Sequence, residues 1–474
     1  MEIGFIIVSL VLITAIVFSK IFYRLGTPSV IIFLGSGLLI GSDGLGWVNF
    51  NNYHMAQNIS TIALIFIMFY GGFGVNLKQA KPILKSAILL SSIGTIFTAL
   101  LVAAFSTLVL KFSFPQGLLV GSVVASTDAA SVFSIFNAHK LSLKNNAGPL
   151  LEVESGSNDP FAYMMTILAI ELIKYDQNTS IFLFMTQQII VGVGVSLIIS
   201  LILSKLFERI NLEYDGLYSI FIMAVILLVF GVSSHFGGNG YLTIYLTGII
   251  FNNSRKIPSR RSLVHFFDGI SWLMQLVLFL TLGLLVNPSE FKGVILIAIA
   301  IGLFLTIIAR PLVVFSLLIK SKFTTNDKWL ISFAGIRGAA SIVFATYALG
   351  LDDLFVNDLF NIVFFIALMS VLIQGSLLPY VADKLKVISA DKQEVKNLSY
   401  YEDEVGAYLV EIIIKENHKW INRNLQAITI PEETWIMMIK RSGIIVVPNG
   451  GTKLKLNDIV VVASNNEKIV QELC

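Results

Sequence analysis

Apolar stretches of about 20 residues recur along most of this 474-residue chain, and each is long enough to cross a bilayer as a helix. Charged residues make up only 13% of the chain, against about 25% in typical globular domains. Backbone groups in lipid must be hydrogen-bonded internally, so we expect an all-α polytopic bundle. Thirteen spans are predicted, near residues 3–19, 28–42, 57–74, 86–110, 115–137, 150–172, 181–204, 216–234, 239–252, 264–286, 292–319, 327–350 and 358–381.

Basic residues in the connections predict the orientation of these spans. With thirteen crossings, Lys111, Lys174 and Lys292 fall on one side, and the other connecting lysines and arginines fall on the opposite side. Because cytoplasmic loops are enriched in basic residues, we expect a multi-pass plasma-membrane protein with its N-terminus outside and its C-terminus in the cytoplasm. The first apolar run has no basic segment before it and no small-residue cleavage site, so it is interpreted as a span and not a cleaved signal.

The composition changes near residue 385, after which the chain becomes polar with short alternating apolar stretches. Two domains are therefore expected: a transmembrane domain at 1–385 and a small cytoplasmic α/β domain at 395–474. Strands and turns in the second domain follow from its alternation and its glycines, whereas Trp420–Ala427 and Glu467–Leu473 are predicted as helices. The predicted strands are Gly406–Lys415, Thr434–Lys440, Ile444–Pro448 and Ile459–Ala463.

Ionisable residues inside otherwise apolar spans mark the candidate functional region. Each costs about 2.5–3.5 kcal/mol on insertion scales and needs a structural or functional reason. The fifth span carries Ser126–Thr127–Asp128, the sixth opens with Glu152 and Glu154–Pro160, and the eleventh and twelfth carry Arg310 and Arg337. Such a set of buried charges favours a transporter over a simple membrane anchor.

Helical spacing gathers oxygen atoms on one surface of the sixth span. Ser155 and Asp159 are four residues apart and share a helix face. Pro160 has no N–H, so the carbonyl of Gly156 loses its helical donor. A carboxylate, a hydroxyl and a freed carbonyl on one surface suit a hard cation, and Asp128 with the Thr127 hydroxyl could complete the site from the fifth span.

Two short segments are predicted to be unwound within their spans. Thr127–Asp128 lies in mid-span beside small residues. In the twelfth span, Gly335 and Gly338 are the small residues beside Arg337. Paired broken helices in the two halves of a transporter point to an ion site near the middle of the membrane.

Structural roles compete with transport roles for these charges. Glu154 and Arg337 are predicted to form a structural ion pair, because a fixed pair does not easily bind and release ions. Asp159 is then left without a cationic partner and is assigned to transport. Two roles stay open for Asp128, as an ion ligand or as support of the helix break. Glu152 is expected to face water. Scattered histidines give no metal site, and no cofactor is expected.

The order of the motifs resembles that of the cation:proton antiporter-1 family, in particular its NhaP-type bacterial members. The matching elements are S-T-D in the fifth span, E-S-x-x-N-D in the sixth and G-I-R-G-A in the twelfth, and the resemblance covers about residues 1–385. It implies a homodimer of thirteen-helix protomers with a mobile core built on inverted repeats. It also implies a transporter and not an enzyme.

The resemblance implies roles for individual residues. The ion and proton site would comprise Asp159 as the binding carboxylate, with Asp128, Thr127, Ser155 and Asn158 around it. Asn158 would mark the electroneutral type, and Glu154 with Arg337 would be the structural ion pair. Ala129 follows the aspartate where many archaeal members have proline, which leaves the shape of this break open.

The tail is similar to the C-terminal ligand-binding lobe of potassium-conductance regulators and TrkA-type subunits, through Pro431, Pro448 and the stretch Leu456–Val462. This resemblance implies a regulatory module that dimerises and binds a small anionic ligand, with a cyclic dinucleotide as the leading candidate. A solvated surface role competes with ligand binding for each available cation. These cations are Lys440, Arg441, Lys453 and Lys455.

A proton and a cation competing for one carboxylate would exchange one for one. Potassium/proton exchange is favoured, because NhaP-type antiporters with such a tail are usually potassium/proton exchangers; sodium or lithium exchange is the alternative. A ligand-gated cation channel would need a carbonyl filter such as TVGYG, which the sequence lacks. A non-transporting sensor would not need Asp128 and Asp159 in mid-span. The expected partners are the cation, the proton, membrane lipid and a second copy, with no nucleic acid.

Overall fold

The computed structural model divides the chain into two compact units, Met1–Tyr400 and Tyr401–Cys474, which are described separately. The fold is described here for residues 2, 9–10, 13–14, 16–17, 30–50, 52–139, 141–174, 180–210, 212–254, 260–349, 351, 354–389, 408–414, 418, 420–428, 434–441 and 444–464.

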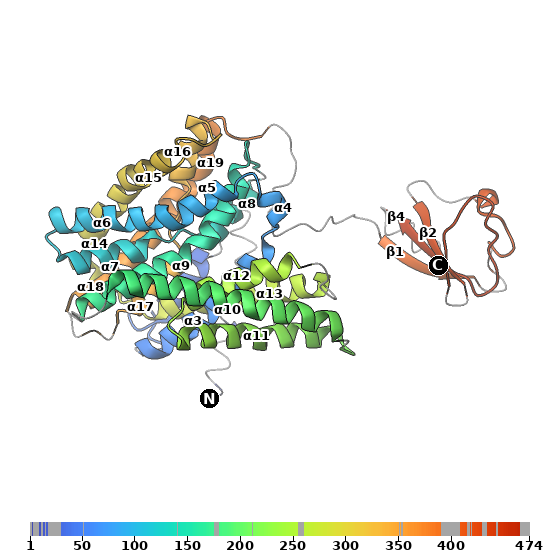
Figure 1. The fold of residues 1–474 in the computed structure, drawn as a ribbon, viewed down its shortest axis with the longest axis horizontal. Helices are drawn as coiled ribbons and strands as arrows, with labels where there is room; N and C mark the ends of the chain where they lie inside the picture. Colours follow the sequence, from blue (N-terminus) through green and yellow to red (C-terminus); the bar gives the residue numbers. More distant parts are fainter. Residues whose placement is uncertain are drawn as a thin grey trace. The chain divides into compact units, whose positions relative to one another are not determined.

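The first unit is a bundle of helices (Figure 1). In chain order its helical elements are α2 (Val30–Ile40), α3 (Tyr53–Gly74), α4 (Leu77–Ala80), α5 (Leu84–Leu89), η1 (Leu90–Gly94), α6 (Thr95–Leu108), α7 (Phe114–Ala125), α8 (Ala129–Ala138), α9 (Ala147–Ile173), α10 (Ile181–Arg209), α11 (Asp215–His235), α12 (Gly240–Asn252), α13 (Arg260–Leu284), η2 (Pro288–Gly293), α14 (Ile295–Phe304), η3 (Leu305–Ala309), α15 (Arg310–Leu317), α16 (Thr325–Phe333), α17 (Ala339–Thr346), α18 (Leu354–Met369), η4 (Ser370–Gln374) and α19 (Gly375–Lys384).

The expected all-α membrane architecture is confirmed. Within the described part of the chain, eight helices are long and apolar enough to cross a membrane. Helices α2 and α12 are also apolar but shorter. Helical segments occupy the second to thirteenth predicted spans. The first predicted span, 3–19, lies largely outside the described residues, so the count of thirteen stays a prediction.

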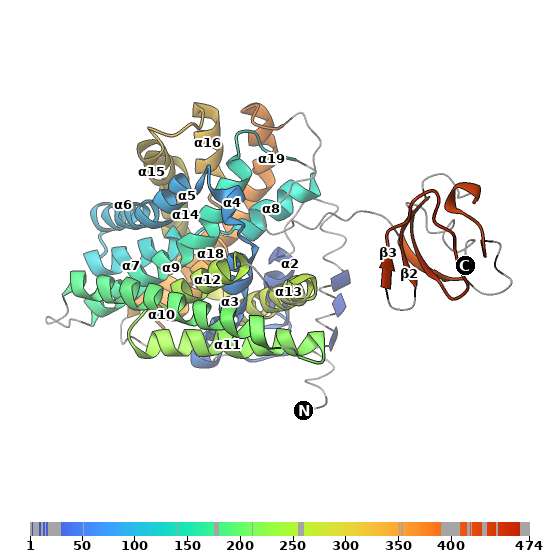
Figure 2. The same ribbon diagram turned by 45° about the vertical axis from the view of Figure 1, so that its right-hand side comes forward.

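The helices of the first unit form two groups. Helices α2, α3 and α10–α13 pack mainly against one another, and helices α5–α9 and α14–α19 form the second group. Figures 1 and 2 show α3 and α10–α13 together at the lower side of the bundle, with α5, α6, α15 and α16 above them. Small residues allow close contact inside the first group: a Cβ on Gly72 would lie 2.2 Å from the carbonyl oxygen of Tyr245.

Two helix pairs are interrupted where the sequence predicts unwinding. Helix α7 ends at Ala125 and α8 begins at Ala129, while α16 ends at Phe333 and α17 begins at Ala339. The two extended segments meet, because the Asp128 backbone N–H donates to the Ile336 carbonyl at 2.8 Å. The predicted paired breaks are therefore confirmed, and they bring the S-T-D and G-I-R-G motifs together.

The second unit contains a four-stranded antiparallel sheet in the order β1-β4-β2-β3. Its strands are β1 (Tyr408–Ile413), β2 (Thr434–Arg441), β3 (Ile444–Val446) and β4 (Ile459–Ser464), which agree with the four predicted strands. Alternate residues of the sheet face a small apolar core that includes Ile412, Ile439, Val460 and Val462.

One predicted helix of the tail is wrong over most of its length. In the stretch Trp420–Ala427 only Leu425–Ala427 forms a short 3-10 turn. The backbone N–H groups of Asn422 and Leu425 donate to the carbonyls of Leu454 and Thr452, so this segment pairs with the chain before β4 and does not close helical bonds. The predicted helix at Glu467–Leu473 lies outside the described residues.

Candidate functional site

A cavity of about 350 Å³ lies between the two groups of helices. Helices α3 and α13 form one wall, and α8, α9, the α7–α8 break and the start of α17 form the other. Its lining comprises Leu64, Ile67, Met68, Tyr70, Gly71, Ser126, Thr127, Asp128, Ala129, Ala130, Phe133, Ser134, Asn137, Glu152, Ser155, Gly156, Asp159, Ser271, Trp272, Gln275, Phe279, Gly338, Ala339 and Ala340.

One face of α9 lines this cavity. Glu152, Ser155, Gly156 and Asp159 follow the spacing of zero, three, four and seven residues that places side chains on a single helix face. The side chain of Asp159 is 8% exposed and accepts a hydrogen bond from the Ser126 hydroxyl. Glu152, predicted to face water, is half-buried and lines the same cavity. Glu152 and Asp159 thus share the cavity with Asp128, and the first two lie about 10 Å apart along the axis of α9.

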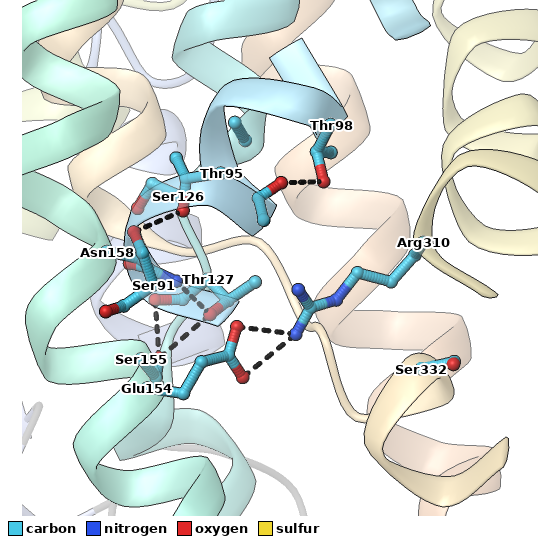
Figure 3. A network of polar contacts seen from close by, with 12 residues as sticks. Ser91, Thr95, Thr98, Ser126, Thr127, Glu154, Ser155, Asn158, Arg310 and Ser332 are labelled. Atoms are coloured by element: carbon cyan, nitrogen blue, oxygen red, sulfur yellow. Dashed lines mark hydrogen bonds and ion pairs between the residues drawn. The ribbon is translucent and has the colours of Figure 1, made fainter. Parts of the chain in front are cut away.

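A chain of hydrogen bonds ties the α7–α8 break to α9 (Figure 3). The Asn158 side-chain amide donates to the Thr127 hydroxyl at 2.5 Å, and that hydroxyl donates to the Ser155 hydroxyl at 3.1 Å. The Ser155 hydroxyl in turn donates to the Thr127 carbonyl at 2.6 Å. Thr127 and Ser155 line the cavity, whereas Asn158 is absent from its lining and is bonded to Thr127. The arrangement holds the extended segment beside Asp159.

Asp128 supports the helix break directly. Its carboxylate accepts bonds from the backbone N–H groups of Ala130 and Ser131, at 3.0 and 3.4 Å, and from the Ser131 hydroxyl at 2.6 Å. A carboxylate at this position satisfies free N–H groups at the start of α8 and is favoured by the helix dipole. Asp128 also lines the cavity, and its role as an ion ligand stays a prediction.

The predicted ion pair between Glu154 and Arg337 is wrong in its partner. The Arg310 Nη2 atom lies 2.7 and 2.9 Å from the two carboxylate oxygens of Glu154, and both side chains are almost fully buried. Gly335 makes room for this contact, since a Cβ there would lie 2.8 Å from Arg310 Nε. Figure 3 shows Arg310 reaching across to Glu154.

Arg337 instead holds the end of α7. Its Nη1 atom donates to the carbonyls of Ala125 and Ser126 at 2.7 and 2.8 Å, and its backbone N–H donates to the Ser370 hydroxyl at 2.9 Å. A helix end leaves carbonyls without donors, and a cation there is also favoured by the helix dipole. The break between α7 and α8 creates this demand, which is the physical reason that Arg337 does not pair with Glu154.

Ser126 is a residue of the site that the sequence interpretation did not assign. It belongs to the S-T-D motif and donates to Asp159. The signal was available, because a hydroxyl in an unwound segment one residue before Thr127 has no helix face to constrain it and can turn toward α9.

In the tail, Arg441 is engaged within its own unit. Its Nε and Nη2 atoms lie 2.8 Å from the two carboxylate oxygens of Asp458, and Nη2 also donates to the Lys453 carbonyl at 2.7 Å. The hydrogen bonds from Arg441 to Asp458 hold the pKa of the Asp458 carboxyl below its usual value. Among the predicted cations, Lys453 and Lys455 are exposed and Lys440 is half-buried.

Two family models match this chain, one within each of its two units. A family model described as the transmembrane part of the sodium/hydrogen exchanger matches residues 7–384, and a TrkA-C domain model matches residues 409–473. The K(+)/H(+) antiporter NhaP2 of Shewanella baltica is 32% identical over 98% of this chain and 81% of that protein. The K(+)/H(+) antiporter NhaP of Alkalimonas amylolytica is 32% identical over 96% of this chain and 80% of that protein.

More distant similarity extends to an archaeal protein of known structure. The Na(+)/H(+) antiporter 1 of Methanocaldococcus jannaschii is 24% identical over 73% of this chain and 82% of that protein. The solved structure of the sodium proton antiporter MjNhaP1 from that organism, at pH 8, superposes with a TM-score of 0.71 and covers 81% of this chain and 99% of that chain. The chain therefore belongs to the sodium/hydrogen exchanger family of membrane cation/proton antiporters and carries a TrkA-C domain after its helices.

Proposed function

We propose that this protein is an electroneutral potassium/proton antiporter in which K+ and a proton compete for Asp159. The observation that carries the proposal is the environment of this carboxylate. Asp159 lies in the cavity, accepts a bond from Ser126, and has no basic partner among the described residues. The two buried arginines are used elsewhere, by Glu154 and by the end of α7. A carboxylate without a fixed counter-ion can exchange a proton for a cation.

The mechanism follows from competition for one site. When the proton leaves, the negative charge of Asp159 attracts a cation, and a bound cation disfavours protonation. Thr127, Ser155 and Asp128 are the proposed neighbours of the ion. If only the loaded carboxylate crosses between the two sides, each cycle moves one positive charge in each direction. Asn158 adds no charge, which supports electroneutral exchange.

The choice of potassium rests on the relatives. Proteins named as K+/H+ antiporters match at about 32% identity over nearly the whole chain, whereas the Na+/H+ antiporter matches at 24% over 73%. All monovalent cations accept oxygen ligands, so sodium or lithium exchange stays the alternative for the same site.

We further propose a plasma-membrane homodimer with an outside N-terminus and domains at 1–385 and 395–474. The cavity ends near Asn137 and Glu152, beside the basic α8–α9 connection that the charge pattern assigns to the cytoplasm. The TrkA-C domain is proposed to bind a small anionic ligand such as a cyclic dinucleotide. Lys440, Lys453 and Lys455 remain its candidate cations, while the ion pair of Arg441 with Asp458 argues against a ligand role there.

Reconstitution of the full-length protein into liposomes with an internal pH dye tests the proposed exchange. K+ should dissipate a pH gradient at lower concentration than Na+ or Li+, and an imposed membrane potential of either sign should leave the proton flux unchanged. A flux that changes severalfold with voltage would contradict one-for-one exchange. Cation current without obligatory proton flux would favour the channel alternative.

A further inference from the structure

We propose that Thr61, Tyr241 and Tyr347 form a clasp that closes the bundle on the side opposite the cavity mouth. We define this mouth as the end of the cavity lined by Gly71, Asn137 and Glu152. The clasp would hold the state that this structure shows and would open when the site turns to the other side. The proposal rests on the change of sides that cation/proton exchange requires, and it does not depend on which cation is carried.

Three hydroxyl groups make the contact. The Tyr347 hydroxyl lies 2.9 Å from the Thr61 hydroxyl and 2.9 Å from the Tyr241 hydroxyl. Tyr347 follows α17, which belongs to one helix group, whereas Thr61 in α3 and Tyr241 in α12 belong to the other. Both hydrogen bonds therefore join the two groups of helices.

Aromatic rings surround these hydroxyls. The ring of Tyr163 packs edge-on against Tyr241 and Tyr347, with centroids 4.9 and 5.3 Å apart. Phe344 contacts Tyr163 and Tyr241 at 5.8 and 5.9 Å, and it is fully buried, as is Tyr241. Such ring pairs are favourable in addition to their buried area. The rings and hydroxyls together occupy the space between the groups on this side.

The clasp lies directly beyond the deep end of the cavity. On α3 the lining begins at Leu64, one turn after Thr61, and on α9 it ends at Asp159, one turn before Tyr163. On α17 the lining ends at Ala340, about two turns before Tyr347. Three helices thus run from the cavity to the clasp, and the contact separates Asp159 from the opposite side.

Exposure of Asp159 to that side requires the clasp to part. A hydrogen bond is directional and is lost over a small displacement, so the contact favours two discrete arrangements over a gradual slide. Loss of the Tyr347 hydroxyl removes both hydrogen bonds of the clasp. Each neutral hydrogen bond contributes modestly to the state that holds it, so the loss of both should raise the population of the opposite-facing state about tenfold.

Side-specific labelling of a single cysteine measures that population. Cys474, the one native cysteine, is replaced by serine, and Leu64→Cys places a thiol at the deep end of the cavity beside the clasp. A membrane-impermeant maleimide is added to proteoliposomes on the side opposite the cavity mouth. The matched control is Tyr218→Phe, because the Tyr218 hydroxyl is also hydrogen-bonded, to Leu212 and Ile210, but within one helix group.

Tyr347→Phe should accelerate labelling from this side about tenfold, Thr61→Val severalfold, and Tyr218→Phe not at all. An unchanged labelling rate in folded Tyr347→Phe, or an equal increase in Tyr218→Phe, would overturn the clasp. Should Tyr347→Phe fail to fold, Thr61→Val decides alone by the same criterion. Labelling does not depend on ion transport, so failure of the potassium assignment gives a different result: normal labelling shifts without K+-driven proton flux.

Discussion

Arg310 and Arg337 lie in the same buried region of the bundle but satisfy different groups. Arg310 neutralises the carboxylate of Glu154, and Arg337 donates to the carbonyls at the end of α7. Each arginine leaves its Nε atom without a hydrogen-bond partner among the described residues. Both side chains therefore stabilise the frame around Asp159 and form no ion pair with that carboxylate.

A double-mutant cycle on the thermal stability of the purified protein tests this division. Removal of Arg310 leaves a buried carboxylate without compensation and should cost about 3–5 kcal/mol, part of which Glu154→Gln should restore. Arg337→Gln should be less damaging, with a cost of about 1–3 kcal/mol. Its effect should not couple to that of Glu154→Gln. Strong coupling of Glu154 with Arg337, and none with Arg310, would restore the pairing expected from the sequence.

The crossing of the two broken helix pairs is the element on which the site depends. Gly338 lies where the segments touch, and a Cβ there would be 2.4 Å from the Cβ and Oδ2 atoms of Asp128. Its φ of −131° is open to any residue, so close approach and not backbone strain requires glycine. The side chain of Asp128 caps α8, and the glycine makes room for it.

Gly338→Ala should displace the Asp128 carboxylate, cost about 1–3 kcal/mol by overpacking, and reduce exchange strongly. Gly194→Ala is the matched control, because its Cβ would meet nothing within 4 Å and alanine favours a helix interior. Thermal unfolding and proton flux are measured on both. A Gly338→Ala protein with normal stability and normal exchange would show that the crossing tolerates a side chain.

The sequence predicted the two breaks, the four strands and the helices at the second to thirteenth spans, because these follow from small residues, alternation and hydropathy. It was insufficient where the outcome depended on tertiary contacts. The sequence pattern predicts a pair of Glu154 with Arg337 and gives Arg310 no partner, whereas the packed structure pairs Arg310 with Glu154. The segment Trp420–Ala427 has a helical pattern, but its N–H groups find partners in the chain before β4. The hydrogen-bonded hydroxyls of Thr61, Tyr241 and Tyr347 join three segments that are distant in the sequence, which no local pattern signals.

At the scale of the whole molecule, the end of the helical unit contacts the cavity-lining helices. The chain after α19 pairs with the α8–α9 connection, where the backbone N–H of Lys144 donates to the Val387 carbonyl at 2.9 Å and that of Ser389 to the Ser142 carbonyl at 2.8 Å. Helices α8 and α9 both line the cavity. These bonds belong to the helical unit and should be kept in any shortened protein.

Truncation after Ser389 therefore separates regulation from assembly. A regulatory tail predicts a dimer that still exchanges ions, with altered pH or ion dependence and no response to an added anionic ligand. Size-exclusion chromatography with light scattering and proteoliposome flux measure both properties. Inactive monomers after truncation would show that the tail is a structural part of the dimer and would contradict the proposal that it is a ligand-binding regulator.

The most direct test of the central claim is proton flux driven by K+ in proteoliposomes containing Asp159→Asn. The substitution keeps the side-chain volume and removes the titrating charge, so the protein should remain folded and dimeric but show no cation/proton exchange. Asp383→Asn, the same change at an exposed position in α19, should exchange at the wild-type rate. Exchange near the wild-type rate in a folded Asp159→Asn protein would contradict the assignment of Asp159 as the shared carboxylate.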